Sequence, residues 1–131
     1  MMENTTTNTR FYRDNDGWNG ETTVELPDLG KGKQLVINTS KSRGNAAITS
    51  IASVRTLERG MWTIVFAGSK DGDYFKRVGC SEVGKRATER TVRKQHEGVL
   101  ATLDSILQNV MEHYAAQQQR KEEAEAQRLA A

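Results

Sequence analysis

Apolar positions in the first two thirds of the chain recur in short, β-prone runs separated by turn residues. The runs cover residues 22–26, 33–39, 46–57, 61–67 and 74–80. Between them lie Gly, Asp and Asn, which suit turns because Gly tolerates positive φ and Asp bonds its own backbone. The connections are too short for parallel crossovers. The pattern therefore predicts an antiparallel β-meander of four to five strands.

Two of these runs have a distinctive pattern. Within residues 46–57 the apolar side chains of Ile48, Ile51 and Val54 do not follow a strict period of two, which predicts a β-bulge. Residues 61–67 (MWTIVFA) are apolar on both faces and rich in β-formers. A strand of this kind is typical of the centre of a sheet, so we expect a central position for it.

The period changes to a helical one from about Lys85, with Ser81 as a candidate N-cap. The apolar stripe consists of Val92, His96, Val99, Leu103, Ile106, Leu107, Val110 and Tyr114. At about 100° wide, the stripe suits one long helix that covers one face of a sheet. Gly98 lies off the stripe and predicts a kink or a break there, since Gly weakens a helix interior.

These patterns define an α+β fold with three parts. Residues 1–20 are rich in Thr, Asn, Asp and Gly and predict a flexible polar arm, on which at least one of Phe11, Tyr12 and Trp18 docks. Residues 21–115 form the single sheet-plus-helix domain. Residues 116–131 favour helix but have no apolar face, so we expect a solvated or frayed tail.

Composition narrows the class of protein. The chain has 131 residues, the length of one domain, and 36% of them are hydrophobic. The single Cys80 cannot form an internal disulfide, which favours a reducing compartment. No run is long and apolar enough for a membrane span, and the N-terminus lacks the pattern of a signal peptide. A cytoplasmic protein without membrane contact is the expectation.

The net charge of +2 hides an uneven distribution. Residues 1–30 hold two basic and six acidic side chains, and residues 95–131 hold three basic and six acidic ones. Residues 31–94 hold fourteen basic and five acidic side chains, a net charge of +9. An anionic partner responds to this local density rather than to the total charge.

The basic centre supplies the candidate binding residues. They are Lys31, Lys33, Lys41, Arg43, Arg55, Lys76, Arg77, Lys85, Arg86, Arg90, Arg93 and Lys94. Phosphate backbones reward such a cluster because each neutralised phosphate releases counterions. Trp62, Phe66, Tyr74 and Phe75 lie among these cations and would stack on bases if they face outward. The alternative is an ordinary solvated charge pattern around aromatic core residues.

The sequence does not support a calcium site, a zinc site or a catalytic nucleophile. The run from Asp14 to Glu21 looks like a calcium loop but has Asn19 where the loop requires Gly. Cys80, His96 and His113 lack the spacing of zinc ligands, and there is no nucleophile elbow. We therefore expect no metal, no cofactor and no enzymatic activity.

The element order over residues 22–114 resembles in outline the ββββα modules that bind single-stranded nucleic acid, such as PUR-like modules. The resemblance implies that the helix covers one face of the sheet while the other face or its loops meet the ligand. Modules of this kind often dimerise, so a homodimer is a further expectation. The primary hypothesis is a non-enzymatic accessory protein that binds DNA or RNA. The alternative is an inhibitor or assembly factor whose basic centre binds an acidic protein surface.

Overall fold

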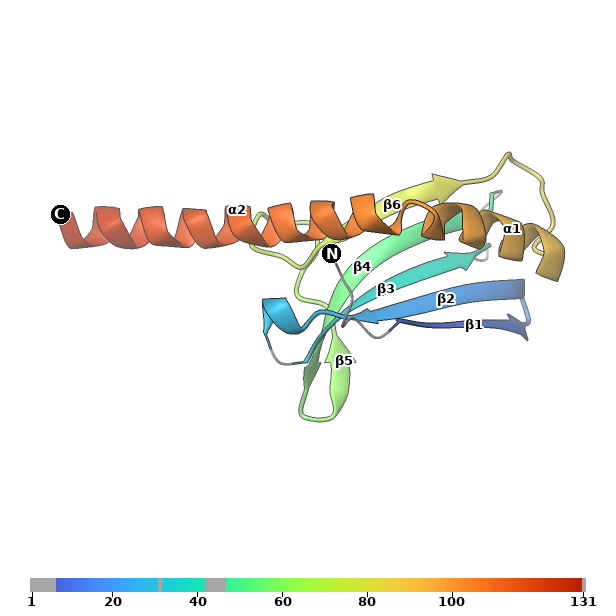
Figure 1. The fold of residues 1–131 in the computed structure, drawn as a ribbon, viewed down its shortest axis with the longest axis horizontal. Coiled ribbons are helices and arrows are strands. Elements are labelled where there is room, and N and C mark those ends of the chain that lie inside the picture. The colour runs from blue at the N-terminus through green and yellow to red at the C-terminus, as the bar shows by residue number, and fades with distance from the viewer. Residues whose placement is uncertain (1–6, 31, 42–46, 131) are drawn as a thin grey trace.

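The computed structural model describes residues 7–30, 32–41 and 47–130, and it has an antiparallel sheet with two helices on one face (Figure 1). The strands are β1 (Thr7–Asp14), β2 (Gly17–Glu25), β3 (Lys33–Ser40), β4 (Thr49–Glu58), β5 (Met61–Thr63) and β6 (Phe75–Cys80), with a 3-10 turn η1 (Pro27–Leu29) after β2. The helices are α1 (Glu89–Leu100) and α2 (Leu103–Ala130). The α+β class, the meander order β1 to β5 and the long C-terminal helix are confirmed.

Strand β4 has two different neighbours on one edge. Its other edge pairs with β3 along the whole length of β3. On the first edge, residues 49–53 of β4 pair with β6 and residues 56–58 pair with β5. Strands β5 and β6 are thus two pieces of one interrupted edge, and residues 64–74 leave the sheet between them. The register of β4 with β6 shifts between Ser50 and Ile51, but the extra residue, Val78, lies on β6. Strand β4 itself pairs with β3 without interruption, so the predicted bulge within residues 46–57 is wrong.

The prediction of a flexible arm over residues 1–20 is wrong for residues 7–20, because these residues belong to the sheet. Strand β1 pairs with β2 along all eight of its residues. The two strands are joined by a tight turn in which Asp14 Oδ1 accepts the Asp16 N–H at 2.8 Å and Gly17 takes a φ of 118°. On the side facing the helices, the hydroxyls of Thr9 and Thr22 are bonded at 2.8 Å. Hydrogen bonding to β2 therefore orders a polar segment that has little apolar periodicity.

The prediction of a central strand over residues 61–67 is also wrong. Only Met61–Thr63 forms a strand, and it is the last strand of the meander with a single partner. The turn before it, Arg59-Gly60, has positive φ at both residues, which closes a tight two-residue hairpin. The side chains from Met61 to Phe66 are all exposed. Figure 1 shows this hairpin protruding from the rest of the sheet.

The helical region begins later than the sequence predicts. Thr88, not Ser81, is the N-cap of α1: its hydroxyl accepts the Thr91 N–H at 3.2 Å, and the Thr91 hydroxyl accepts the Thr88 N–H at 3.0 Å. Ser81 instead accepts the Ile48 N–H. Gly98 lies inside α1, and the break falls between Leu100 and Leu103.

The break occurs where Thr102 competes for a backbone carbonyl. Both its N–H, at 2.9 Å, and its hydroxyl, at 2.7 Å, donate to the Val99 carbonyl. A threonine hydroxyl that bonds back to the previous turn is a known cause of helix distortion. The break therefore follows from a side chain of the sequence, but from Thr102 and not from Gly98.

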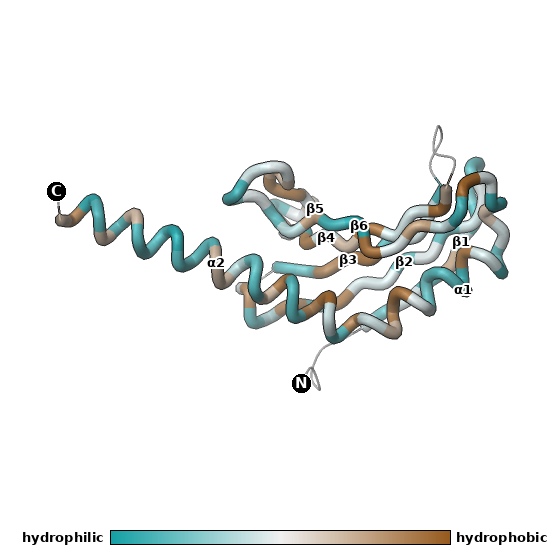
Figure 2. Tube along the Cα trace, turned by 90° about the horizontal axis from the view of Figure 1, so that it is seen from above, coloured by the Kyte–Doolittle hydropathy of each residue, from teal (hydrophilic) through white to brown (hydrophobic). Residues whose placement is uncertain are grey.

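The core lies between the sheet and both helices. Figure 2 shows α1 and α2 on the same side of the strands, with the C-terminal part of α2 extending past them. The predicted apolar stripe is confirmed as the buried face: Val92, His96, Val99, Ile106, Leu107 and Val110 are buried, and Leu103 and Tyr114 are half-buried. Opposite them lie Val24, Leu35, Ile37, Ala52 and Val54 of the central strands.

Candidate nucleic-acid interface

The strongest concentration of positive charge lies where the loop after β6 enters α1. Residues 85–94 hold five basic side chains and one acidic one. The N-cap at Thr88 fixes where the helix begins, and Val92, His96 and Val99 fix which face is buried. Arg90 and Lys94 lie one helical turn apart, are exposed, and lie on the opposite face of the helix from the buried stripe. The helix therefore presents this pair to solvent.

The end of β3 adds another cation to the same region. Lys41 Nζ donates to the carbonyl of Lys85 at 2.8 Å, which places the end of β3 beside the loop of residues 81–88. A surface hollow of about 320 Å³ lies between this loop and α1, lined by Ile48, Ser81, Glu82, Lys85, Lys94 and Gln95. Lys85 and Lys94 thus flank one concave surface.

Three strand glycines allow α1 to lie close to the sheet. A Cβ on Gly17 would lie 2.8 Å from the Ala87 carbonyl oxygen, and one on Gly20 would lie 3.0 Å from His96 Cγ. A Cβ on Gly79 would lie 3.0 Å from Val99 Cγ2. Larger residues at these positions would push the basic end of α1 away from the strands.

His96 anchors α1 through a chain of buried hydroxyl groups. Its Nε2 lies 2.7 Å from Thr22 Oγ1 and its Nδ1 lies 2.8 Å from Thr39 Oγ1. Thr39 in turn bonds Ser50 Oγ at 2.7 Å, so the chain reaches β4. A hydroxyl can donate or accept, so a neutral imidazole is satisfied on both ring nitrogens.

The surroundings of this imidazole favour its neutral form. Burial lowers the pKa of His96, and the nearby Glu97 carboxylate opposes that shift in part. The ring of Phe11 contacts His96 edge-on, at 5.5 Å between centroids. His96 thus holds α1 against the sheet, with both ring nitrogens hydrogen-bonded to threonine hydroxyls.

The predicted binding residues on the strands do not all join this cluster. Arg55 lies on the sheet face away from the helices, where it donates to Gln34 and stacks over Trp62 at 4.5 Å. Arg77 and Lys76 are exposed on β6. In the pairing of β4 with β6, Arg77 lies opposite Ile51, so its side chain is on the sheet face away from the helices. Lys31 and Arg43 lie outside the described residues.

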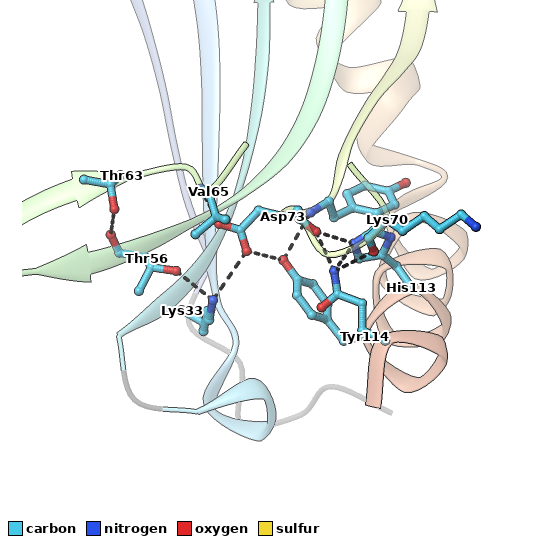
Figure 3. Close-up of polar contacts among 11 residues, drawn as sticks. Lys33, Thr56, Thr63, Val65, Lys70, Asp73, His113 and Tyr114 are labelled. Carbon is cyan, nitrogen blue, oxygen red and sulfur yellow. Dashed lines mark hydrogen bonds and ion pairs between the residues drawn. The ribbon is translucent and has the colours of Figure 1, made fainter. Parts of the chain in front are cut away.

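Lys33 lies at the other end of the molecule, where it forms an ion pair. Its ammonium lies 3.4 Å from Asp73 Oδ1 and donates to Thr56 Oγ1 at 2.7 Å (Figure 3). The side chain of Lys33 is 22% exposed and that of Asp73 is 4% exposed, so the pair is largely removed from water. Lys33 is therefore paired with an acid that is distant in sequence, and it lies apart from the cations near α1.

The sequence analysis did not recognise the polar cluster around Asp73, which closes the excursion of residues 64–74. The Asp73 carboxylate accepts the Val65 N–H at 2.9 Å and the Tyr114 hydroxyl at 2.8 Å, as Figure 3 shows. Burial, and then the adjacent Asp73 side chain, raise the pKa of the Tyr114 hydroxyl above its usual range, which keeps it a donor.

Helix α2 binds the backbone of the same excursion. The Gly72 carbonyl accepts from His113 Nε2 at 2.9 Å and from Gln117 Nε2 at 2.6 Å, and the Lys70 carbonyl accepts from Arg120. A Cβ on Gly72 would lie 1.7 Å from the Phe66 carbonyl oxygen, so only Gly fits there. The cluster thus resembles an acid–base set in composition, but its polar atoms hold the loop against α2.

This cluster lies at the base of an open groove of about 590 Å³ between η1, the excursion and α2, whose walls include Asp28, Leu29, Asp71, Met111 and Gln118. The groove walls combine acidic, basic and amide side chains without a dominant charge.

One further cation near the loop before α1, Arg13, was not among the predicted binding residues because it lies in the segment interpreted as an arm. Arg13 is exposed and pairs with Trp18, whose N–H donates to the Ala87 carbonyl at 2.9 Å. The β1–β2 turn therefore lies against the loop before α1. Asp14 and Asp16 of the same turn offset the charge of Arg13. The signal that could have revealed this hairpin was the Asn15-Asp16-Gly17 turn, because Asp-Gly is typical of tight hairpin connections.

In residues 7–30, 32–41 and 47–130, no group of three or more His, Cys, Asp or Glu side chains could hold a metal ion. No helix in this part of the chain has the length and apolar character needed to cross a membrane. No protein-family model, curated protein or solved structure matches this chain.

Proposed function

We propose that this chain is a non-enzymatic accessory protein that binds nucleic acid through the basic end of α1. The observation that carries the proposal is the convergence of cations from two separate parts of the chain onto that end. The basic end is defined as Lys41, Lys85, Arg86, Arg90, Arg93 and Lys94. Among the ion pairs of the described residues, only one, between Arg93 and Glu89 at 3.3 Å, involves a member of this set.

The chemistry of the basic end suits a phosphate backbone. Flexible lysine and arginine side chains on a loop and a helix neutralise phosphates without reading bases. The Arg93 guanidinium also lies over the ring of Phe11 at 4.1 Å, which holds this head group at the surface of α1, where the residue is exposed. We therefore expect binding of DNA or RNA with little sequence preference. The exposed, unpaired Cys80 thiol agrees with a cytoplasmic location.

The test is a titration of labelled single-stranded and double-stranded oligonucleotides at several salt concentrations. Five phosphate contacts would give a slope of log affinity against log salt of about −3.5 to −4.5. The double variant Arg90→Gln, Lys94→Gln should reduce the magnitude of this slope by about 1.5 to 2. The matched control Lys121→Gln, Arg128→Gln removes the same charge from the exposed tail of α2 and should leave the slope unchanged.

Absence of binding at low salt, or an equal loss in the tail control, would contradict the proposal. The second candidate is the binding of an acidic protein surface by the same cations. A partner retained after nuclease treatment by a protein without affinity for oligonucleotides would favour that alternative.

A further inference from the structure

The β4–β5 hairpin and the residues after it carry the largest exposed apolar surface of the described chain. Its members, here called the hairpin patch, are Leu57, Met61, Trp62, Ile64, Val65 and Phe66, with exposed fractions between 38% and 75%. A large side chain offers roughly 150–250 Å² when fully accessible, so the hairpin patch presents on the order of 700 Å². The largest patch on a typical monomer is roughly 300–600 Å², while one partner of a standard interface buries about 800 Å².

The backbone of β5 offers an unprotected edge beside this patch. Leu57 donates its N–H to the Gly32 carbonyl at 2.8 Å, toward β3. Hydrogen-bonding direction alternates along a strand, so the neighbours of Leu57, at positions 56 and 58, bond β5 instead. Their partners in the register are Thr63 and Met61. The N–H and C=O groups of Trp62 therefore point to the outer edge.

The alternation of hydrogen-bonding direction continues beyond Trp62, to Ile64 and Val65. Val65 bonds inward, because its N–H donates to Asp73 Oδ2 and its carbonyl accepts the Asp73 N–H. Ile64 therefore points outward like Trp62. Two outward residues centred on Thr63 are the repeat that an antiparallel neighbour needs.

Natural proteins normally blunt such an edge with charge, proline or a covering element. Residues 60–69 (GMWTIVFAGS) contain no charged residue and no proline. Figure 1 shows the hairpin protruding on the side of the molecule away from α1. Side chains on both faces of β5 are exposed. A partner that packed against one face of the strand would therefore cover only half of them.

We propose that a second copy of this chain covers the hairpin patch by pairing β5 with β5 about a two-fold axis through Thr63. In this register Trp62 of each copy lies opposite Ile64 of the other, and aromatic and β-branched residues pair favourably across strands. An uncharged strand meets its own copy without repulsion, although each chain carries a net charge of +2. The dimer joins two sheets and leaves both basic ends exposed.

The first test is the mass of the full chain in solution by sedimentation equilibrium, from low to high micromolar concentration. We expect a reversible dimer. Ile64→Lys places two like charges across the axis and should weaken the dimer by at least about tenfold. The matched control Leu129→Lys changes an equally exposed apolar residue on the tail of α2 and should leave the dimer intact.

The second test fixes the register by cross-linking, in a Cys80→Ser background. Non-hydrogen-bonded partners in an antiparallel ladder have Cα atoms about 4.5 Å apart, which a disulfide can span. Thr63→Cys should therefore form a disulfide dimer under mild oxidation. Met61→Cys should not, because the two copies of position 61 would be about 13 Å apart.

A wild-type chain that stays monomeric at every concentration overturns the proposal. So does a dimer that resists Ile64→Lys, or one that cross-links through position 61 and not through position 63. Capture of an extended strand from a different protein by a monomeric chain would also overturn it and assign the hairpin patch to a different partner.

Discussion

Strands β3 and β5 both contain β-branched or aromatic residues but have very different surroundings. Leu35 and Ile37 of β3 are completely buried, while Met61 of β5 is 68% exposed. Strand β3 has a hydrogen-bonded neighbour on each edge and a helix above it, whereas β5 has one neighbour. The difference shows that β-propensity predicts a strand, while the number of neighbours decides whether its side chains leave water.

The polar groups of the two regions differ in the same way. Under α1, His96 and three hydroxyl groups form a continuous chain inside the sheet-helix interface. Beside β5, no helix in the part of the chain that the structure describes covers the strand, and the Asp73 carboxylate instead ties the excursion back to Val65 and α2. Burial by apolar packing stabilises the first region, and a local polar cluster stabilises the second.

The largest expected effect comes from comparing the truncation of an isoleucine in β3 with that of the isoleucine directly after β5. Ile37→Ala removes a fully buried side chain and should lower the free energy of unfolding by about 2–5 kcal/mol. Ile64→Ala removes an exposed one and should change it by less than about 0.5 kcal/mol. Urea denaturation at low protein concentration, where any dimer dissociates, measures both. Similar losses in the two variants would contradict the contrast between the strands.

The next largest expected effect comes from removing the Asp73 carboxylate, which closes the excursion of residues 64–74. Asp73→Ala removes the acceptor of the Val65 N–H and the Tyr114 hydroxyl, so it should lower the free energy of unfolding by about 2–4 kcal/mol. The matched control Asp71→Ala, at an exposed position of the same loop, should cost less than about 0.5 kcal/mol. Chemical denaturation checks both values. Equal costs would show that the cluster is not what holds the loop.

The sequence was sufficient where local pattern and final environment agree. The stripe from Val92 to Val110 predicted the buried helix face, and the turn residues predicted the meander. The sequence misled where a distant group decides the outcome. The apolar pattern of residues 61–67 is typical of a central strand. No neighbouring residue in the sequence indicates that the chain leaves β4 after Thr63. Likewise, nothing near Lys33 indicates that Asp73, forty residues away, neutralises it.

The candidate interface was predictable for the same reason as the helix. Arg86, Arg90, Arg93 and Lys94 are close in sequence, and helical periodicity predicts that they point away from the apolar stripe. In the structure Lys85 and Arg86 lie in the loop before α1. The contribution of Lys41 depends on its contact with the Lys85 carbonyl, which requires the tertiary structure. Arg55 and Arg77 share the basic segment but lie on the sheet, because position along the chain does not specify the face of a strand pair.

The smallest expected effect is the pH dependence of stability that the buried His96 of α1 produces. Burial lowers the pKa of His96 in the folded state below its unfolded value of about 6.5, so below that pH the unfolded chain binds a proton that the folded chain resists. The stabilisation by neutral His96 is complete above about pH 6.5. As the pH falls toward the folded-state pKa, the free energy of unfolding should decrease by up to about 1.4 kcal/mol per pH unit.

Urea denaturation between neutral and mildly acidic pH measures this slope. His96→Gln should remove its contribution, because glutamine does not titrate. Glu97→Gln should extend the sloping range to lower pH, because the Glu97 carboxylate raises the pKa of His96 against the effect of burial. A His96→Gln variant that keeps the full slope would assign the acid sensitivity to groups outside the α1 region, and the buried imidazole would then not distinguish the two regions of the sheet.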